Sequence, residues 1–187
     1  MKEADIRRYN ELVKSAREKE RESSHLQAAE IWSRAAELTD KEELKSACRV
    51  SRGICMSMGG EYEPAKKVFQ KLISEMKLNE QNHVDLLLEC HLHLAWNEHD
   101  RNQHAYSVSF FRKAIAYAEK HGKSIPLKHV QPFFSFQKEE LDRLKMHGDK
   151  VGMAKVAKDI LRTYEAMGLE FLGKSVRSEM KALGVEL

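Results

Sequence analysis

The sequence is poor in glycine and proline, with 9 glycines and 3 prolines among its 187 residues. These residues favour turns, so their scarcity argues against sandwiches, barrels and doubly wound sheets, whose chains change direction often. No segment shows sustained alternation of apolar and polar residues, so no strand is predicted. Apolar residues recur instead at helical spacing, as at Val68, Phe69, Leu72, Ile73 and Met76. The sequence therefore predicts an all-α protein of antiparallel helical hairpins, with about nine helices stacked as a short solenoid in a single domain, 1–187.

Long apolar runs are absent as well. No run approaches the roughly 20 apolar residues that a membrane-spanning helix requires. The charged first residues, Met1 to Asp5, lead into no apolar stretch, so we expect no signal peptide. The cysteines Cys48, Cys55 and Cys90 are odd in number and form no Cys-x-x-Cys pair. Such cysteines suit reduced thiols in a reducing compartment, and we therefore expect a cytoplasmic protein with no membrane partner.

The motifs of common catalytic and cofactor sites are missing. The sequence contains no Gly-x-Ser-x-Gly elbow, no glycine-rich phosphate loop and no His-Glu-x-x-His. A metal site is one hypothesis, because a cysteine and four histidines fall within one expected hairpin: Cys90, His91, His93, His99 and His104. His91 and His93 are two residues apart and point to nearly opposite sides of a helix, so the set offers only pairs on one face. We expect no enzyme and no catalytic, cofactor-binding or metal-binding residues.

One packing pattern occurs three times. A small residue is followed four positions later by an aromatic residue, and three positions later by another small or apolar residue. The small residue lets two helices approach, and the aromatic ring fills the groove beside it. The three occurrences are Ala28-Trp32-Ala35, Ala65-Phe69-Leu72 and Ser107-Phe111-Ala114. We predict that the three aromatic side chains are buried between helices.

This spacing resembles the tetratricopeptide repeat. Gly53 supports the resemblance, because it is a small residue near the end of the helix that precedes the second occurrence. The occurrences are offset by 37 and 42 residues, which exceeds the family's period of 34. The resemblance implies hairpins over about 3–38, 40–77 and 80–120, with C-terminal helices within 133–183.

Glycines and prolines set the expected helix boundaries. Gly122, Gly168 and Gly184 are placed to end helices. The segment 121–132, which contains Pro126 and Pro132, is expected to be a long loop. The helices are expected over 3–21, 24–38, 40–58, 61–77, 80–99, 102–120, 133–147, 149–167 and 169–183.

A second resemblance covers residues 9–55. The residues that carry it are Tyr9-Asn10-Glu11-Leu12, Ala16, Glu18, the run from Gln27 to Ala35, and Arg52-Gly53-Ile54-Cys55. This block resembles the ANR family of small bacterial regulators. The resemblance implies a helical bacterial or phage protein whose partner is a transcriptional activator of the AraC type.

Helical hairpin arrays leave a groove that takes a peptide or a partner helix, and such surfaces bind more often than they catalyse. The first helix of each hairpin is expected to line that groove. The candidate partner-binding residues on these helices are Arg8, Arg49, Arg52, His91 and Glu98. Arg49 and Arg52 are three residues apart, so both side chains project from one helix face. We therefore expect a regulatory or adaptor protein that acts by protein–protein contact on a protein or peptide segment.

The charge distribution leaves a second hypothesis open. The net charge is −4 over residues 59–100 and +5 over residues 101–128. A basic stretch can receive an acidic partner, phosphate backbones included. The alternative is thus a nucleic-acid-associated regulator that uses a basic surface of Arg101, Arg112, Lys113, Lys120, Lys123 and Lys128.

Three phenylalanines follow Pro132 closely: Phe133, Phe134 and Phe136. Three such side chains within four positions of one helix cannot all face one core. Packing between two neighbouring helices is one interpretation, and contact with a partner is the other.

Overall fold

The computed structural model describes residues 3–187, and this part of the chain is helical, with no strand. It divides into two compact units, Met1–Asn102 and Gln103–Leu187. The all-α hairpin architecture is therefore confirmed. The expected single domain, 1–187, is described here as two units, and the boundary divides the hairpin expected over 80–120.

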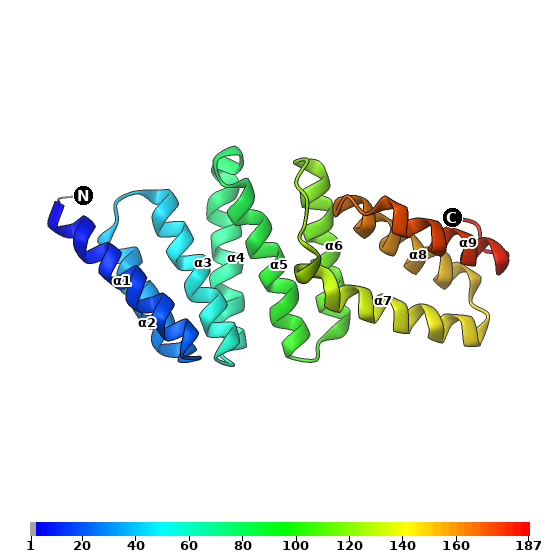
Figure 1. Cartoon of the computed structure of the whole chain (residues 1–187), viewed down its shortest axis with the longest axis horizontal. Coiled ribbons are helices and arrows are strands. Elements are labelled where there is room, and N and C mark those ends of the chain that lie inside the picture. Colours follow the sequence, from blue (N-terminus) through cyan, green and yellow to red (C-terminus); the bar gives the residue numbers. More distant parts are fainter. Residues whose placement is uncertain (1–2) are drawn as a thin grey trace. The chain divides into compact units, whose positions relative to one another are not determined.

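The first unit contains two helical hairpins and one further helix (Figure 1). Helices α1 and α2 form the first hairpin, α3 and α4 form the second, and α5 packs against both α3 and α4. A short 3-10 helix, η1, connects α4 to α5. The bounds are α1 Glu3–Arg21, α2 His25–Leu38, α3 Glu42–Met58, α4 Tyr62–Met76, η1 Lys77–Asn82 and α5 Val84–Asp100.

The predicted packing pattern builds the core of this unit. Trp32 and Phe69 are buried, as are the small residues Ala28 and Ala65 beside them. Gly53 on α3 meets the ring of Phe69 on α4, because a Cβ at Gly53 would lie 2.8 Å from the ring atom Cε1. The close approach of α3 and α4 thus requires glycine at this position.

The second unit consists of α6 and a hairpin of α7 and α8, with α9 folded back on α8. Phe111 on α6 is fully buried, as predicted, and its ring centroid lies 5.5 Å from that of Phe133 on α7. Phe134 stacks on Tyr164 of α8, and the half-buried Phe136 contacts His104 of α6, so each of the three phenylalanines has a ring contact within this unit. The bounds are α6 His104–Lys120, α7 Leu127–His147, α8 Lys150–Ala166, η2 Glu170–Leu172 and α9 Gly173–Ala182.

The loop expected over 121–132 is wrong in its second half. Helix α7 begins at Leu127, so Pro132 lies inside the helix. Val130 and Phe133 are both fully buried, and their burial stabilises the first turns although a proline there removes one backbone hydrogen bond. The expected C-terminal glycines are confirmed: Gly122, Gly168 and Gly184 all have positive φ.

Two further helices start four residues later than predicted. The helix expected from residue 80 begins at Val84, because η1 occupies the preceding residues. The last helix begins at Gly173, after η2. In both cases a 3-10 helix precedes the α-helix, and short 3-10 turns are frequent at helix termini. Among the described residues, no helix is both long and apolar enough to cross a bilayer.

Candidate binding site

A hollow of about 500 Å³ lies between α3 and α4, and it is called the α3–α4 hollow below. Five of its seven lining residues are cationic, and one is acidic. The lining residues are Lys45, Arg49, Arg52, Lys67, Val68, Lys71 and Glu75. The hollow therefore gathers basic side chains from two helices at one place.

Helical spacing on both helices produces this cluster. On α3, Lys45, Arg49 and Arg52 stand at i, i+4 and i+7, which places them on one face. On α4, Lys67 and Lys71 stand at i and i+4. The buried residues of α4 lie opposite its basic face, and those of α3 lie on both sides of its basic face, so packing of the hairpin leaves the two basic faces beside each other.

Glu75 partly neutralises the hollow. Its Oε2 accepts a hydrogen bond of 2.6 Å from Nη1 of Arg49, and its Oε1 lies 3.9 Å from Nζ of Lys71. The hydrogen bond from Arg49 is the main cause that lowers the pKa of Glu75. Within residues 3–187, no carboxylate lies within salt-bridge distance of Arg52 or Lys67. The hollow is therefore left with more positive than negative charge.

The predicted partner-binding residues are only partly brought together. Arg49 and Arg52 both line the α3–α4 hollow, whereas Arg8 lies exposed on α1 and His91 lies half-buried on α5. Neither Arg8 nor His91 lines the hollow.

The expectation for Glu98 is wrong. Its side chain is 1% exposed, and its Oε1 lies 2.8 Å from Nζ of Lys66 and 3.4 Å from Nη1 of Arg101. Burying a carboxylate requires paired cations. Lys66 reaches Glu98 from α4, and Arg101 lies three residues after it at the end of α5. Glu98 is thus a structural residue rather than one presented to a partner.

The six cations of the predicted basic surface over 101–128 do not all lie in one unit. Arg101 belongs to the first unit, where it pairs with Glu63 at 2.5 Å as well as with Glu98. The other five cations lie in the second unit. There, the guanidinium of Arg112 binds Asp159 on α8, and Nζ of Lys113 lies 5.0 Å above the ring of Phe110.

Lys120 and Lys128 are exposed, and Lys123 is half-buried. Both arginines of the set thus already have carboxylate partners, so the set offers less free positive charge than the sequence indicates.

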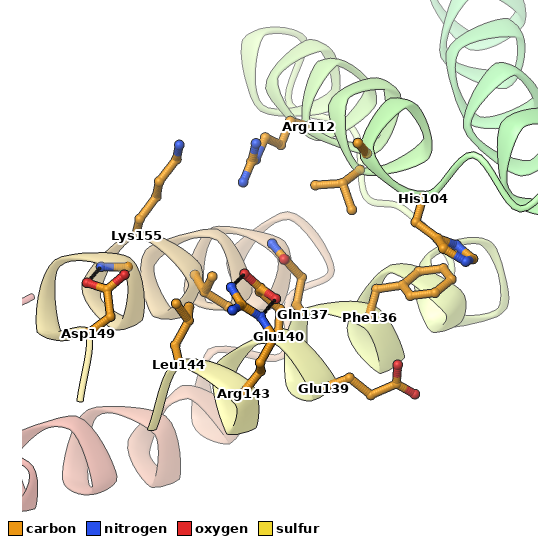
Figure 2. A pocket seen from close by; sticks show the side chains of 14 residues that line it. His104, Arg112, Phe136, Gln137, Glu139, Glu140, Arg143, Leu144, Asp149 and Lys155 are labelled. Carbon is orange, nitrogen blue, oxygen red and sulfur yellow. Dashed lines mark hydrogen bonds and ion pairs between the residues drawn. The ribbon is translucent and has the colours of Figure 1, made fainter. Parts of the chain in front are cut away.

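A second pocket lies within the second unit, between α6, α7 and α8, and is called the α6–α8 pocket (Figure 2). Its volume is about 740 Å³. Its apolar lining comes from Ala105, Val108, Phe136, Leu144 and Val156.

Three charged residues that line the α6–α8 pocket have a partner of opposite charge: Arg112, Glu140 and Arg143. Arg143 binds Glu140 through two hydrogen bonds of 2.7 Å, drawn as dashed lines in Figure 2. Asp159 accepts from Arg112 and also from the amide of Gln137 at 3.2 Å. The lining of the pocket contains three lysines and arginines and three carboxylates, so the pocket has no excess of positive charge and attracts an anion less strongly than the α3–α4 hollow does.

Nothing in the described residues resembles a metal centre or a reactive thiol. Among residues 3–187, no three potential ligands of His, Cys, Asp or Glu type gather at one point. Burial raises the pKa of Cys55 and of Cys90 to about 12, and it also raises the pKa of Cys48. These thiols are therefore protonated at neutral pH and act as small core residues.

The three lysines of the hollow, Lys45, Lys67 and Lys71, were not among the predicted partner-binding residues, and neither were Val68 and Glu75. The signal for the lysines exists, because Lys45 stands four residues before Arg49, and Lys67 and Lys71 are also four residues apart. What the sequence does not show is that these two faces lie side by side.

No protein-family model matches the chain, and no curated protein or solved structure matches it either. The likenesses to the tetratricopeptide repeat and the ANR family therefore remain interpretations of the sequence pattern.

Proposed function

We propose that this protein is a non-enzymatic regulatory or adaptor protein whose α3–α4 hollow binds an acidic segment of a partner protein. One observation carries the proposal: five cations and a single carboxylate line one hollow. Arginine and lysine form charge-assisted hydrogen bonds to carboxylates, and these are the stronger class of hydrogen bond. A partner segment with several acidic groups would accept hydrogen bonds from the lysines and arginines of the hollow that Glu75 does not bind.

The charge of the surrounding unit makes the cluster distinctive. Residues 1–102 contain 17 lysines and arginines and 19 aspartates and glutamates, a net charge of −2. The basic hollow is therefore a local concentration on an acidic unit rather than part of a generally basic surface. Local concentration of this kind supports recognition of one partner segment over unspecific attraction.

The partner is proposed to be a transcriptional regulator. The resemblance of residues 9–55 to the ANR family supports an activator of the AraC type, and both Arg49 and Arg52 fall within that block. Regulation would then follow from occupying an acidic surface of the activator.

The test measures binding of a fluorescein-labelled peptide rich in Asp and Glu by fluorescence anisotropy, with its Asn/Gln counterpart as the reference. We expect the acidic peptide to bind, and the double variant Arg49→Ala with Arg52→Ala to weaken binding about tenfold or more, since each charged hydrogen bond contributes about 1.5–3 kcal/mol. The matched control is Lys14→Ala with Arg17→Ala, which removes the same charge from exposed positions on α1.

Unchanged binding by a folded Arg49/Arg52 variant would remove the hollow from the proposal. The nucleic-acid alternative is tested in parallel with a DNA duplex. Steeply salt-dependent duplex binding that is lost on replacing Lys113, Lys120 and Lys128 would favour the alternative instead.

A further inference from the structure

The α3–α4 hollow holds more positive charge than one carboxylate can neutralise. Its five cations and Glu75 give it a formal charge of +4 at neutral pH. Glu75 binds only one of these cations closely. It accepts a hydrogen bond from Arg49, and its distance of 3.9 Å to Nζ of Lys71 is near the limit for a salt bridge. Arg52 and Lys67 remain without a carboxylate partner within residues 3–187.

A phosphoryl group matches this arrangement better than a carboxylate does. It carries a charge of about −1.5 to −2 at neutral pH and offers three strong acceptor oxygens. The planar guanidinium of arginine binds phosphate oxygens in pairs, while lysine supplies a mobile point charge. The hollow provides both donor types from two facing helices, with Arg49 and Arg52 on α3 and Lys67 and Lys71 on α4.

We propose that the α3–α4 hollow binds a phosphorylated segment of the partner protein, and that Glu75 is the internal carboxylate with which the phosphoryl group competes for Arg49. This inference rests on the proposed function and specifies the anion. Since the side chain of Glu75 is 41% exposed, it can leave Arg49 without opening the core.

The surroundings of the hollow favour a short segment over a nucleic acid. Glu42 stands three residues before Lys45 at the start of α3, and Glu63, which pairs with Arg101, stands four residues before Lys67 at the start of α4. Carboxylates therefore occur about one turn from the first cation of the hollow on each helix. A long polyanion would have to pass these carboxylates, whereas a single phosphorylated residue would not.

The test compares three peptides that differ at one central position, which is Ser, Glu or phosphoserine, by isothermal titration calorimetry. We expect the phosphoserine peptide to bind at least about tenfold more tightly than the Glu peptide. Arg52→Gln and Lys67→Gln should each reduce this preference several-fold. Glu75→Gln should tighten binding of the phosphoserine peptide, because the competing carboxylate is removed.

The control is again Lys14→Ala with Arg17→Ala, and circular dichroism verifies that each variant is folded. Equal affinity for the Glu and phosphoserine peptides would overturn this inference and leave the proposed function in place. Binding of neither peptide would overturn both. Tighter binding of a single-stranded oligonucleotide, lost in the same Arg52 and Lys67 variants, would assign the hollow to nucleic acid and overturn both as well.

Discussion

The indole nitrogen of Trp32 donates a 2.6 Å hydrogen bond to the carboxylate of Glu20, which joins the middle of α2 to the end of α1. The same oxygen accepts from Sγ of Cys55 on α3 at 3.2 Å. The carboxylate of Glu20 on α1 therefore links α1 to both α2 and α3. Trp32 contributes to stability both through its buried ring and through this polar bond.

We predict that Trp32→Phe destabilises the protein by about 1.5–3 kcal/mol, because the ring volume is largely kept while a hydrogen bond to a charged acceptor is lost. Urea denaturation followed by circular dichroism measures the change. Glu20→Gln, which retains an acceptor oxygen, should cost less than Trp32→Phe. A larger loss for Glu20→Gln would indicate that the charge of Glu20 matters through other contacts.

Truncation of Phe69 should be among the most costly single changes in the first unit. Phe69→Ala is expected to lower the free energy of unfolding by about 3–5 kcal/mol, as deletions of buried aromatic rings do. Phe171→Ala is the matched control, because Phe171 is 64% exposed and its loss should cost less than about 0.5 kcal/mol. Similar losses for both variants would contradict the burial assigned to Phe69.

Gly53 and Phe69 should be energetically coupled. Gly53→Ala is expected to destabilise the protein by about 1–3 kcal/mol, because the added methyl group meets the Phe69 ring at 2.8 Å. Phe69→Leu should relieve part of that cost, so a double-mutant cycle should give a favourable coupling energy. Strict additivity of the two changes would show that the helices separate rather than clash.

Glu98 should matter for stability. We expect Glu98→Ala to cost about 3–5 kcal/mol, because it leaves Lys66 and Arg101 facing a partly buried space without their carboxylate. Glu30→Ala on the exposed face of α2 serves as the control and should change stability by less than about 0.5 kcal/mol. Chemical denaturation at neutral pH measures the free energy of unfolding of both variants. A loss for Glu98→Ala as small as that for Glu30→Ala would contradict the structural role of Glu98.

Stability should fall at alkaline pH because of the buried thiols. The pKa of Cys55 and of Cys90 is about 12 in the folded chain, against an ordinary value of 9.0. The unfolded chain therefore releases these protons first as the pH rises, so the free energy of unfolding decreases from about pH 9 up to about pH 12. Denaturation midpoints at pH 7 and pH 10 measure this decrease, and Cys55→Ala should make it shallower. An unchanged pH dependence in that variant would mean that the Cys55 thiol does not contribute.

Several features of the fold could be predicted because they depend on local sequence. Helical spacing, the glycines that end helices and the recurring aromatic positions correctly indicated an all-α protein with Trp32, Phe69 and Phe111 in its core. Gly53 was identified from the crowding that a helix hairpin imposes, and its contact with Phe69 confirms that reasoning. These are properties of one helix or of two consecutive helices.

Other features were decided only by tertiary packing. The burial of Val130 extends α7 through Pro132, against the local preference of proline. Glu98 is withdrawn from the surface because α4 and the end of α5 bring two cations to it. The α3–α4 hollow exists because the register of one hairpin sets a basic face of α3 beside a basic face of α4. Spacing along the chain determines which side chains share a helix face, but only the packing of helices determines which two faces meet.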